Sequence, residues 1–263
     1  FSCSGDDDGD ANGDNGGTPV TYGNYMPLSV GDNWNYDITR NDGTDTTNGT
    51  DEVTVSGTTT INANEYVDMT ASVGATGVMS QMFDQNYFRT NEGVLYMQGE
   101  FVLPLSDLGG TDENIAINDG KLYDESKASG TVLTSIPGTF NQTIGGIPID
   151  VNYTFKTVQG ASVASHTVNG TTYNDIITSD IVITAKVTTS VEVSGVTIPV
   201  TILALQDIFT IKNYYANGIG LVDSDADFSY TLEDFSGFGI TLPIPDTATI
   251  TTKQEITSYT VAE

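Results

Sequence analysis

The chain has 263 residues, of which 35 are Asp or Glu and 8 are Lys or Arg, so its formal net charge is −27 at pH 7. Nucleic acid is excluded as a partner and anionic membrane surfaces are disfavoured, because binding to phosphate needs clustered Lys and Arg. The apolar share of 38% still allows a core, and no apolar run approaches the ~20 residues of a transmembrane helix.

The chain has one Cys and one His, and this count excludes several chemistries. Cys3 alone cannot form an intramolecular disulfide, and one His with one Cys cannot build a Cys/His zinc site, which needs three or four such ligands. A Ser–His–acid triad would need His166, which lies at a predicted hairpin edge without a Gly-x-Ser-x-Gly motif. We therefore expect His166 on a surface strand and a protein that is not an enzyme. A hydrolase with a carboxylate pair is a distant alternative.

Residues 1–20 are predicted to be a flexible acidic tether. Residues 4–17 contain no large apolar side chain, and such a segment cannot bury enough surface to offset its chain entropy. Cys3 resembles the lipidated residue at the end of a bacterial lipoprotein signal peptide. The segment that follows resembles the acidic export signal of Bacteroidetes-type surface lipoproteins: Ser4, Gly5, Asp6, Asp7 and Asp8.

This resemblance implies a lipid anchor, with acyl chains such as palmitate on Cys3 inserted into outer-membrane lipid and the protein exposed on the cell surface. Buried acyl chains bind a membrane with about 0.8 kcal/mol per CH₂ group. The alternative is an incidental Cys ahead of a disordered tail.

Residues 21–263 are predicted to form one all-β domain of successive antiparallel hairpins. Apolar residues alternate along the segments 149–155 and 181–193, which is typical of strands with one buried and one solvent-facing side. The segments 147–158, 176–193 and 196–212 exceed the usual ~5–6 residues of a strand, which favours a single large curved sheet or half-barrel. Tight turns are predicted where positive φ is easily adopted: Asn62-Ala63-Asn64, Asn91-Glu92-Gly93, Asp119-Gly120, Gly145-Gly146, Asn169-Gly170, Ser194-Gly195 and Asn217-Gly218.

Three similar phrases contain a proline within a β-like run: Gly146-Ile147-Pro148-Ile149, Gly195-Val196-Thr197-Ile198-Pro199-Val200 and Gly239-Ile240-Thr241-Leu242-Pro243-Ile244. Proline cannot donate to a sheet ladder and is confined to edges and bulges. We therefore expect the three phrases at one rim of the sheet.

Two further phrases carry a family resemblance. The first runs from Tyr25-Met26-Pro27-Leu28 to Trp34-Asn35-Tyr36, and the second is Tyr214-Tyr215-Ala216-Asn217-Gly218-Ile219-Gly220-Leu221-Val222. Both resemble phrases of a broad, mostly uncharacterised group of bacterial lipoproteins, although Asp223 stands where that group usually has Lys. The resemblance implies a fold like that of the lipoprotein carriers LolA and LolB, a curved antiparallel sheet that can enclose an apolar cavity.

Candidate site residues are sparse. Asp223, Asp225 and Asp227 alternate along a predicted strand and could hold Ca²⁺, which takes 6–8 oxygen ligands; alternatively they share a solvent face. Tyr214 and Tyr215 are candidate exposed rings for a partner or a sugar. Phe235 and Phe238 open an apolar segment, 235–245, which could be a lid or docking loop, or could fill the core.

The leading hypothesis is a surface-anchored outer-membrane lipoprotein that acts as a non-enzymatic binding or interaction module, with the outer membrane and an outer-membrane protein complex as partners. No cofactor is expected, apart from the calcium candidate. One alternative is a carrier of an apolar or lipid-like ligand, and another is a carbohydrate-binding module. Met69, Met79, Met82 and Met97 could line an adaptable pocket or pack in the core.

Overall fold

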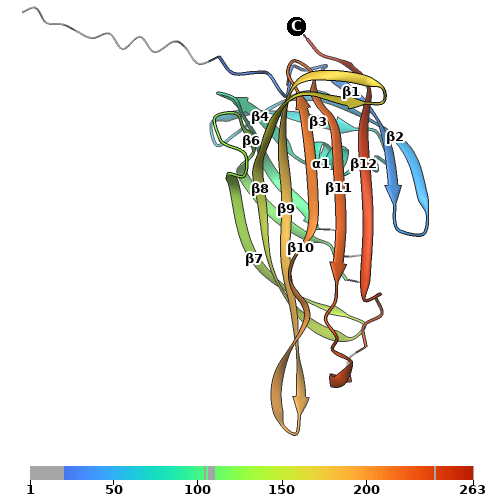
Figure 1. Cartoon of the computed structure of the whole chain (residues 1–263). Helices are drawn as coiled ribbons and strands as arrows, with labels where there is room; N and C mark the ends of the chain where they lie inside the picture. The colour runs from blue at the N-terminus through green and yellow to red at the C-terminus, as the bar shows by residue number, and fades with distance from the viewer. Residues whose placement is uncertain (1–20, 104, 106–109, 240, 263) are drawn as a thin grey trace, which may run out of the picture.

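The computed structural model describes residues 21–103, 105, 110–239 and 241–262 (Figure 1). Strands dominate this part of the chain, with one short α-helix and one 3-10 turn. The strands are β1 (Asn33–Asn41), β2 (Thr46–Ile61), β3 (Asn64–Ala71), β4 (Tyr87–Asn91), β5 (Val94–Leu103), β6 (Glu113–Asp124), β7 (Val132–Ile144), β8 (Ile147–Val168), β9 (Thr171–Val193), β10 (Val196–Ala216), β11 (Gly220–Thr231) and β12 (Thr247–Thr260); the helix is α1 (Val78–Gln85) and the 3-10 turn is η2 (Ser236–Phe238).

The strands form one 12-stranded antiparallel sheet in the order β6-β5-β4-β3-β2-β1-β12-β11-β10-β9-β8-β7. Every pair joins strands that are consecutive in the sequence, except β1 with β12, which are the first and last strands. The predicted all-β class and the single curved sheet are therefore confirmed. The sheet curls until it is nearly a closed barrel (Figure 1).

Most of the predicted turns are hairpin turns with positive φ, for example Asn169 at 48° with Gly170 at 78°. The prediction at Asp119-Gly120 is wrong, because this pair lies inside β6 at an irregularity in its pairing with β5. Asp119 still has φ of 53°. Its bulged carboxylate instead accepts hydrogen bonds from Arg89 and from the Tyr66 hydroxyl.

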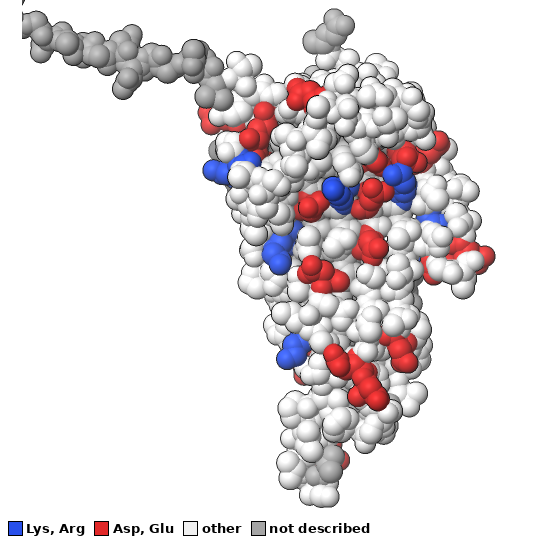
Figure 2. Space-filling view, viewed as in Figure 1, with Lys and Arg blue, Asp and Glu red and all other residues white. Residues whose placement is uncertain are grey.

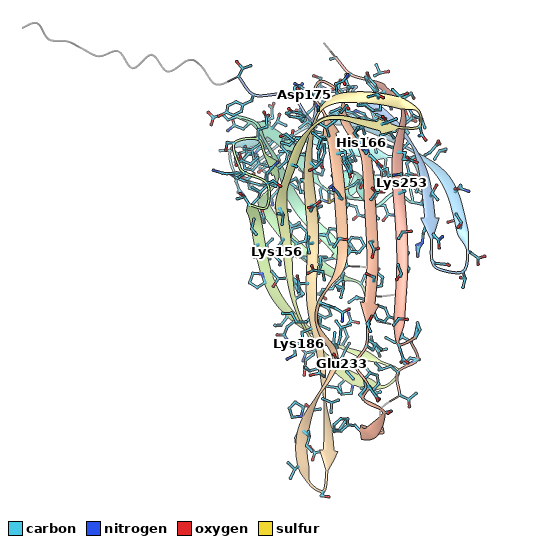
Figure 3. The ribbon with its side chains drawn as sticks, viewed as in Figure 1. Lys156, His166, Asp175, Lys186, Glu233 and Lys253 are labelled. Carbon is cyan, nitrogen blue, oxygen red and sulfur yellow. The ribbon has the colours of Figure 1, made fainter. Side chains whose placement is uncertain are left out.

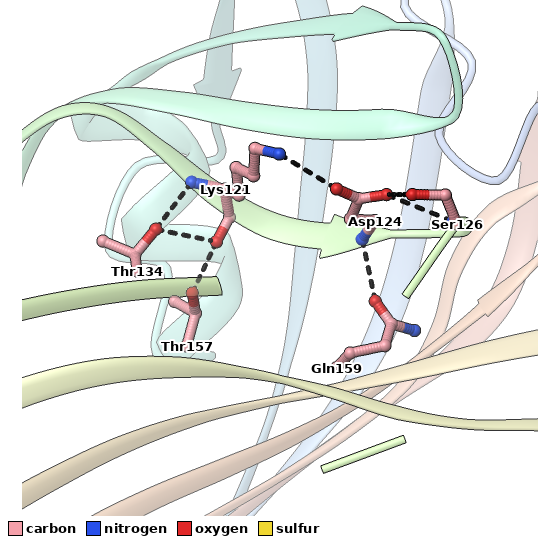
Figure 4. Close-up of polar contacts among 6 residues, drawn as sticks. All are labelled: Lys121, Asp124, Ser126, Thr134, Thr157 and Gln159. Carbon is pink, nitrogen blue, oxygen red and sulfur yellow. Dashed lines mark hydrogen bonds and ion pairs between the residues drawn. The ribbon is translucent and has the colours of Figure 1, made fainter. Parts of the chain in front are cut away.

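The outer strand β6 meets the other outer strand, β7, and its neighbour β8 at a seam held by side chains, with Thr134 on β7 and Thr157 and Gln159 on β8 (Figure 4). The backbone N–H of Lys121 donates to Thr134 Oγ1 at 2.8 Å, and Thr157 Oγ1 donates to the Lys121 carbonyl at 2.5 Å. Further along β6, the Asp124 N–H donates to Gln159 Oε1 at 2.7 Å. Hydroxyl and amide groups thus replace a backbone ladder where the barrel closes.

One end of the barrel is solidly packed, and we call it the closed end. Trp34 Nε1 donates to the Ile219 carbonyl at 2.6 Å, and the Tyr36 hydroxyl donates to the Leu221 carbonyl at 3.0 Å. A Cβ at Gly220 would lie 2.8 Å from Trp34 Nε1, so glycine is needed there. The two phrases that carried the family resemblance therefore contact each other in the core of the closed end.

A long arm covers the closed end. β8 and β9 bend near the register shift between Gln159 and Ser162, and their joined tip passes over β10, β11 and β12 (Figure 1). Val168 on this tip is 1% exposed, and the Asn169 side chain donates to the Ile256 carbonyl of β12. The arm is consequently packed in place.

The opposite end, which we call the open half, holds the three proline-containing phrases. A Cβ at Gly145 would lie 2.6 Å from Pro243 Cδ, and Leu242 packs against Ile144 and Ile149. The turn at Ser194-Gly195 projects from the same end (Figure 1). Their expected place at one rim is confirmed. Both ends of the described chain lie at the closed end, where the Gly218 N–H donates to the Asn24 carbonyl and the Ala262 N–H donates to Asp32 Oδ1.

Candidate functional site

The open half is hollow because the strands differ in length. β1 pairs with β12 only as far as Asn41 opposite Thr251, so the first residues of β12, from Thr247, have no neighbour in β1. β8, β9 and β10 have 22, 23 and 21 residues, whereas β4 has 5. The inner faces of the long strands therefore continue past the short ones and are only partly covered.

The larger hollow, which we call the mouth cavity, has a volume of about 840 Å³. This falls within the ~300–1,000 Å³ typical of ligand pockets. One wall is formed by residues of α1, including Met82, and by the segment 72–76 before it. The other walls come from β5, β10, β11 and β12, including Phe101, Phe209 and Thr252.

Aromatic rings form a boundary between the packed core and the hollows. Phe101 lies against Phe155 and Phe209, each with ring centroids 5.6 Å apart, and Phe209 contacts Phe228 at 6.3 Å. Phe228 contacts Tyr230 at 6.0 Å. Phe228 lines both the mouth cavity and the smaller hollow beside it, so the two hollows adjoin.

The smaller hollow, which we call the apolar pocket, has a volume of about 70 Å³. Gln142 is the one amide among its described lining residues, and Tyr230 is the one hydroxyl-bearing residue. The rest are aliphatic or Phe: Leu103, Leu105, Ile144, Ile149, Val151, Ala185, Val187, Ile202, Leu203, Ile208, Phe228, Leu232, Leu242 and Ile244. Such a lining favours an apolar group and offers little to a polar one.

The apolar segment 235–245 supplies part of this lining. Leu242 and Ile244 face the apolar pocket. Phe235 is 8% exposed and packs with Val200 and Ile202, whereas Phe238 is 48% exposed at the outer surface. The segment thus fills core on one side and covers the end of the sheet on the other. The four methionines pack in the main core, and Met82 also lines the mouth cavity.

His166 belongs to an ion-pair cluster on the outer face of the sheet (Figure 3), whereas the hollows lie on the inner face. Its Nε2 lies 2.7 Å from Asp223 Oδ2, and its ring stacks on Tyr214 at 4.1 Å with an interplanar angle of 6°. Lys253 Nζ lies 3.4 Å from Asp223 Oδ2 and 3.2 Å from Asp225 Oδ1. The expectation of an ordinary surface-strand histidine misses this cluster, because its members are 57 residues apart.

Desolvation and charge both act on Lys253. Burial lowers its pKa, but Asp223, Asp225 and Glu255 oppose this effect, so the net result is a raised pKa. Figure 2 shows Lys and acidic side chains interspersed over this upper part of the outer face. The cluster therefore joins the arm to β11 and β12 through ion pairs and a ring stack, with Lys253 partly offsetting the negative charge of its carboxylates.

The calcium candidate is not supported by the geometry. Asp223, Asp225 and Asp227 alternate on the outer face, and the Lys253 ammonium binds the first two. Among the residues that the structure describes, no group of three or more His, Cys, Asp or Glu side chains could hold a metal ion.

The expectation of two exposed tyrosine rings is wrong for Tyr215. Tyr215 is 0% exposed and packs against Tyr123 with ring centroids 5.2 Å apart. Tyr214 is half-buried beneath His166. Neighbouring residues on one strand point to opposite faces, so the pair cannot form a flat stacking platform for a sugar.

Cys3, Ser4, Gly5, Asp6, Asp7 and Asp8 lie outside the described residues, so lipidation and the export signal stay predictions from the sequence. Within the described part of the chain, no helix has both the length and the apolar character needed to cross a membrane.

Comparison with known proteins gives no family. No family model matches the chain, and no curated protein matches it. A protein from Bacteroides fragilis NCTC 9343, thought to be exported and with a YmcC-like fold, is 11% identical over 91% of this chain and 100% of its own, with a TM-score of 0.38. A protein from Parabacteroides distasonis ATCC 8503, thought to be a lipoprotein, is 12% identical over 90% of this chain and 100% of its own, with a TM-score of 0.33. At these scores neither likeness establishes a shared function or location.

Proposed function

We propose that the chain is a lipid-anchored, non-enzymatic binding protein of the bacterial outer membrane, displayed on the cell surface, whose open half holds an apolar or lipid-like ligand. The observation that carries the proposal is the apolar pocket, whose described lining contains one amide side chain and one hydroxyl-bearing residue, opening beside a cavity of ligand size. An apolar chain in the pocket would be removed from water, which contributes about 25 cal/mol per Å².

The tether's point of attachment and the proposed ligand site lie at opposite ends of the body. The described chain begins at the closed end, where the Asn24 carbonyl accepts the Gly218 N–H, whereas Ile144 and Leu242 of the open half line the apolar pocket. The predicted flexible tether through Cys3 would join the body at its closed end, so its point of attachment would not cover the open half. A ligand could then enter from the surroundings of the cell.

The ligand part of the proposal is tested by filling the apolar pocket. Val187 lines the pocket, whereas its exposed neighbour Lys186 is outside it. We expect Val187→Phe to abolish binding of a fluorescent fatty alcohol and to remove co-purifying lipid from organic extracts analysed by mass spectrometry. Lys186→Phe is the matched control on the same strand and should bind normally. Wild-type protein that carries no lipid and does not bind the probe would contradict the proposal.

The anchor part is tested separately in the native host. Cys3→Ser should move the protein from the membrane fraction to the soluble fraction, and wild-type protein should be digested by protease added to intact cells. Protection of the wild-type protein in intact cells would contradict surface display, and membrane retention of Cys3→Ser would contradict the lipid anchor.

A second candidate is an accessory subunit of an outer-membrane protein complex. It is favoured by large apolar side chains exposed near the open end: Val196 at 61%, Leu205 at 70% and Phe238 at 48%. Single surface apolar residues are common, so this candidate function requires that a partner protein be found bound to the chain. Affinity purification from native membranes should recover one partner with wild-type protein and lose it with Leu205→Asp; recovery of the same protein set with both would count against it.

A further inference from the structure

Four polar side chains form a buried group inside the barrel, which we call the polar recess: Ser80, Asn213, Ser224 and Gln254. On the inner face of the sheet, Asn213 of β10 pairs in register with Ser224 of β11, and Ser224 pairs with Gln254 of β12. Ser80 projects from α1, and its N–H donates to Gln254 Oε1 at 3.2 Å. The four residues are at most 2% exposed.

Several atoms of the recess have no hydrogen-bond partner among the described residues. They are Asn213 Oδ1 and Nδ2, Gln254 Nε2 and Ser80 Oγ. A buried polar atom that gives up water without gaining a partner costs free energy, and most buried polar side-chain atoms in native proteins do have partners. Four such atoms, on side chains that follow one another across β10, β12 and α1, therefore call for partners inside the barrel.

The fold holds α1 against the recess. Asp51 is 3% exposed and its Oδ2 accepts the Gly77 N–H at 2.7 Å, at the start of α1. A Cβ at Gly77 would lie 2.4 Å from Gln254 Oε1, so only glycine allows this approach. Asp51 and Gly77 therefore both help to hold Ser80 against Gln254.

The recess lies directly beside the mouth cavity. Ala226 and Thr252 line that cavity, and they are two residues from Ser224 and Gln254 on the same inner faces of β11 and β12. Residues two apart on a strand lie on one side of the sheet. A small group in the recess is consequently one step along the barrel wall from the larger hollow.

We propose that the polar recess is an internal binding site for a small uncharged guest that both donates and accepts hydrogen bonds. The unpartnered atoms comprise an amide oxygen that accepts, two amide nitrogens that donate and a hydroxyl that does either. None of the four side chains is charged, so the recess offers no opposite charge to an ion, and an uncharged guest fits better. Two sources supply this chemistry: a buried water cluster, or the hydroxyl or amide end of a ligand lying in the mouth cavity. With water as the guest the inference is independent of the proposed function; with a ligand end it rests on that function.

A crystal structure of the protein at high resolution tests the site itself. We expect ordered density within hydrogen-bond distance of Asn213 and Gln254. Density that is absent, with the recess side chains turned to bond one another, would overturn the proposal.

The change in Tm on substitution of Ser80 gives a second test, because its sign differs between an occupied and an empty recess. If Ser80 Oγ bonds a guest, Ser80→Ala should lower the Tm by about 2 °C or more, by the scaling for a domain of this size. If Ser80 Oγ is unpartnered, the same change should raise the Tm, because it removes an uncompensated hydroxyl and Ala favours a helix. A Tm for Ser80→Ala equal to or above that of the wild-type protein would overturn the proposal.

The two sources are separated by extracting bound lipid with organic solvent before crystallisation. Density that persists after extraction assigns water, and density that disappears assigns a ligand end. In the second case Asn213→Val should weaken binding of an alkyl glucoside at least tenfold while leaving a fluorescent hydrocarbon probe unaffected. Density that persists beside a failed Val187→Phe test would leave the recess standing and remove only the apolar-ligand function.

Discussion

The arm that covers the closed end is joined to the sheet by His166, and the strength of this link can be predicted. Asp223 is 3% exposed at its side chain and His166 is 25% exposed, with 2.7 Å between Nε2 and Oδ2. A hydrogen bond to a charged group contributes ~1.5–3 kcal/mol, and a stacked aromatic pair contributes ~0.5–1.5 kcal/mol beyond its area. We therefore expect His166→Ala to lower the free energy of unfolding by about 2–4 kcal/mol.

Urea denaturation at neutral pH measures this change, and a double-mutant cycle with Asp223→Asn isolates the pair. The coupling should be about 1.5–3 kcal/mol, because His166 Nε2 lies 2.7 Å from Asp223 Oδ2, whereas Lys253 Nζ lies 3.4 Å from the same oxygen. Lys253→Met is the matched control: its side chain is 40% exposed, and exposed ion pairs contribute about 0–1 kcal/mol. A loss below about 0.5 kcal/mol for His166→Ala, or a coupling near zero, would refute this reasoning.

Three further outcomes are expected. Burial raises the pKa of Glu125, so the folded state loses stability as the pH rises and this carboxyl ionises. Glu125→Gln retains an acceptor for the Gly23 N–H and should raise the Tm at pH 7, and the gain should vanish only well below the ordinary Glu pKa of about 4.3, where the acid is protonated in both states. Asp51→Ala should cost about 2–3 kcal/mol in urea denaturation because it leaves the buried Gly77 N–H and the Thr76 N–H without acceptors. Asp51→Asn should cost less, and equal losses would contradict the role of Asp51 as their acceptor. Thr157→Val should loosen the seam and speed amide exchange in β6 but not in β11, and uniform exchange rates in the two strands would contradict side-chain closure.

The ion pairs of Lys253 on the outer face predict how the protein responds to removal of calcium. Because Lys253 pairs with Asp223 and Asp225, these carboxylates do not need calcium to offset their repulsion. A chelator should leave the Tm unchanged, as measured by differential scanning calorimetry with and without added Ca²⁺.

Local patterns in the sequence were sufficient to predict the strands. Alternation along 149–155 and 181–193 reflects the two-residue period of a strand with one buried side, and this period does not depend on which strand lies beside it. Asn169-Gly170 and Ser194-Gly195 adopt positive φ readily, so their hairpin turns follow from backbone sterics alone. The same argument failed at Asp119-Gly120, because positive φ also occurs at a bulge within a strand.

Tertiary structure alone decided where the hollows lie and which polar groups meet. The pairing of β1 with β12 joins residues more than 200 positions apart, and the lengths of β8, β9 and β10 beyond their neighbours leave the open half uncovered. The contacts of His166 with Asp223 and of Ser80 with Gln254 also depend on how far the sheet curls. Curvature and closure arise from the summed twist and register of twelve strands, and no short stretch of sequence contains that sum.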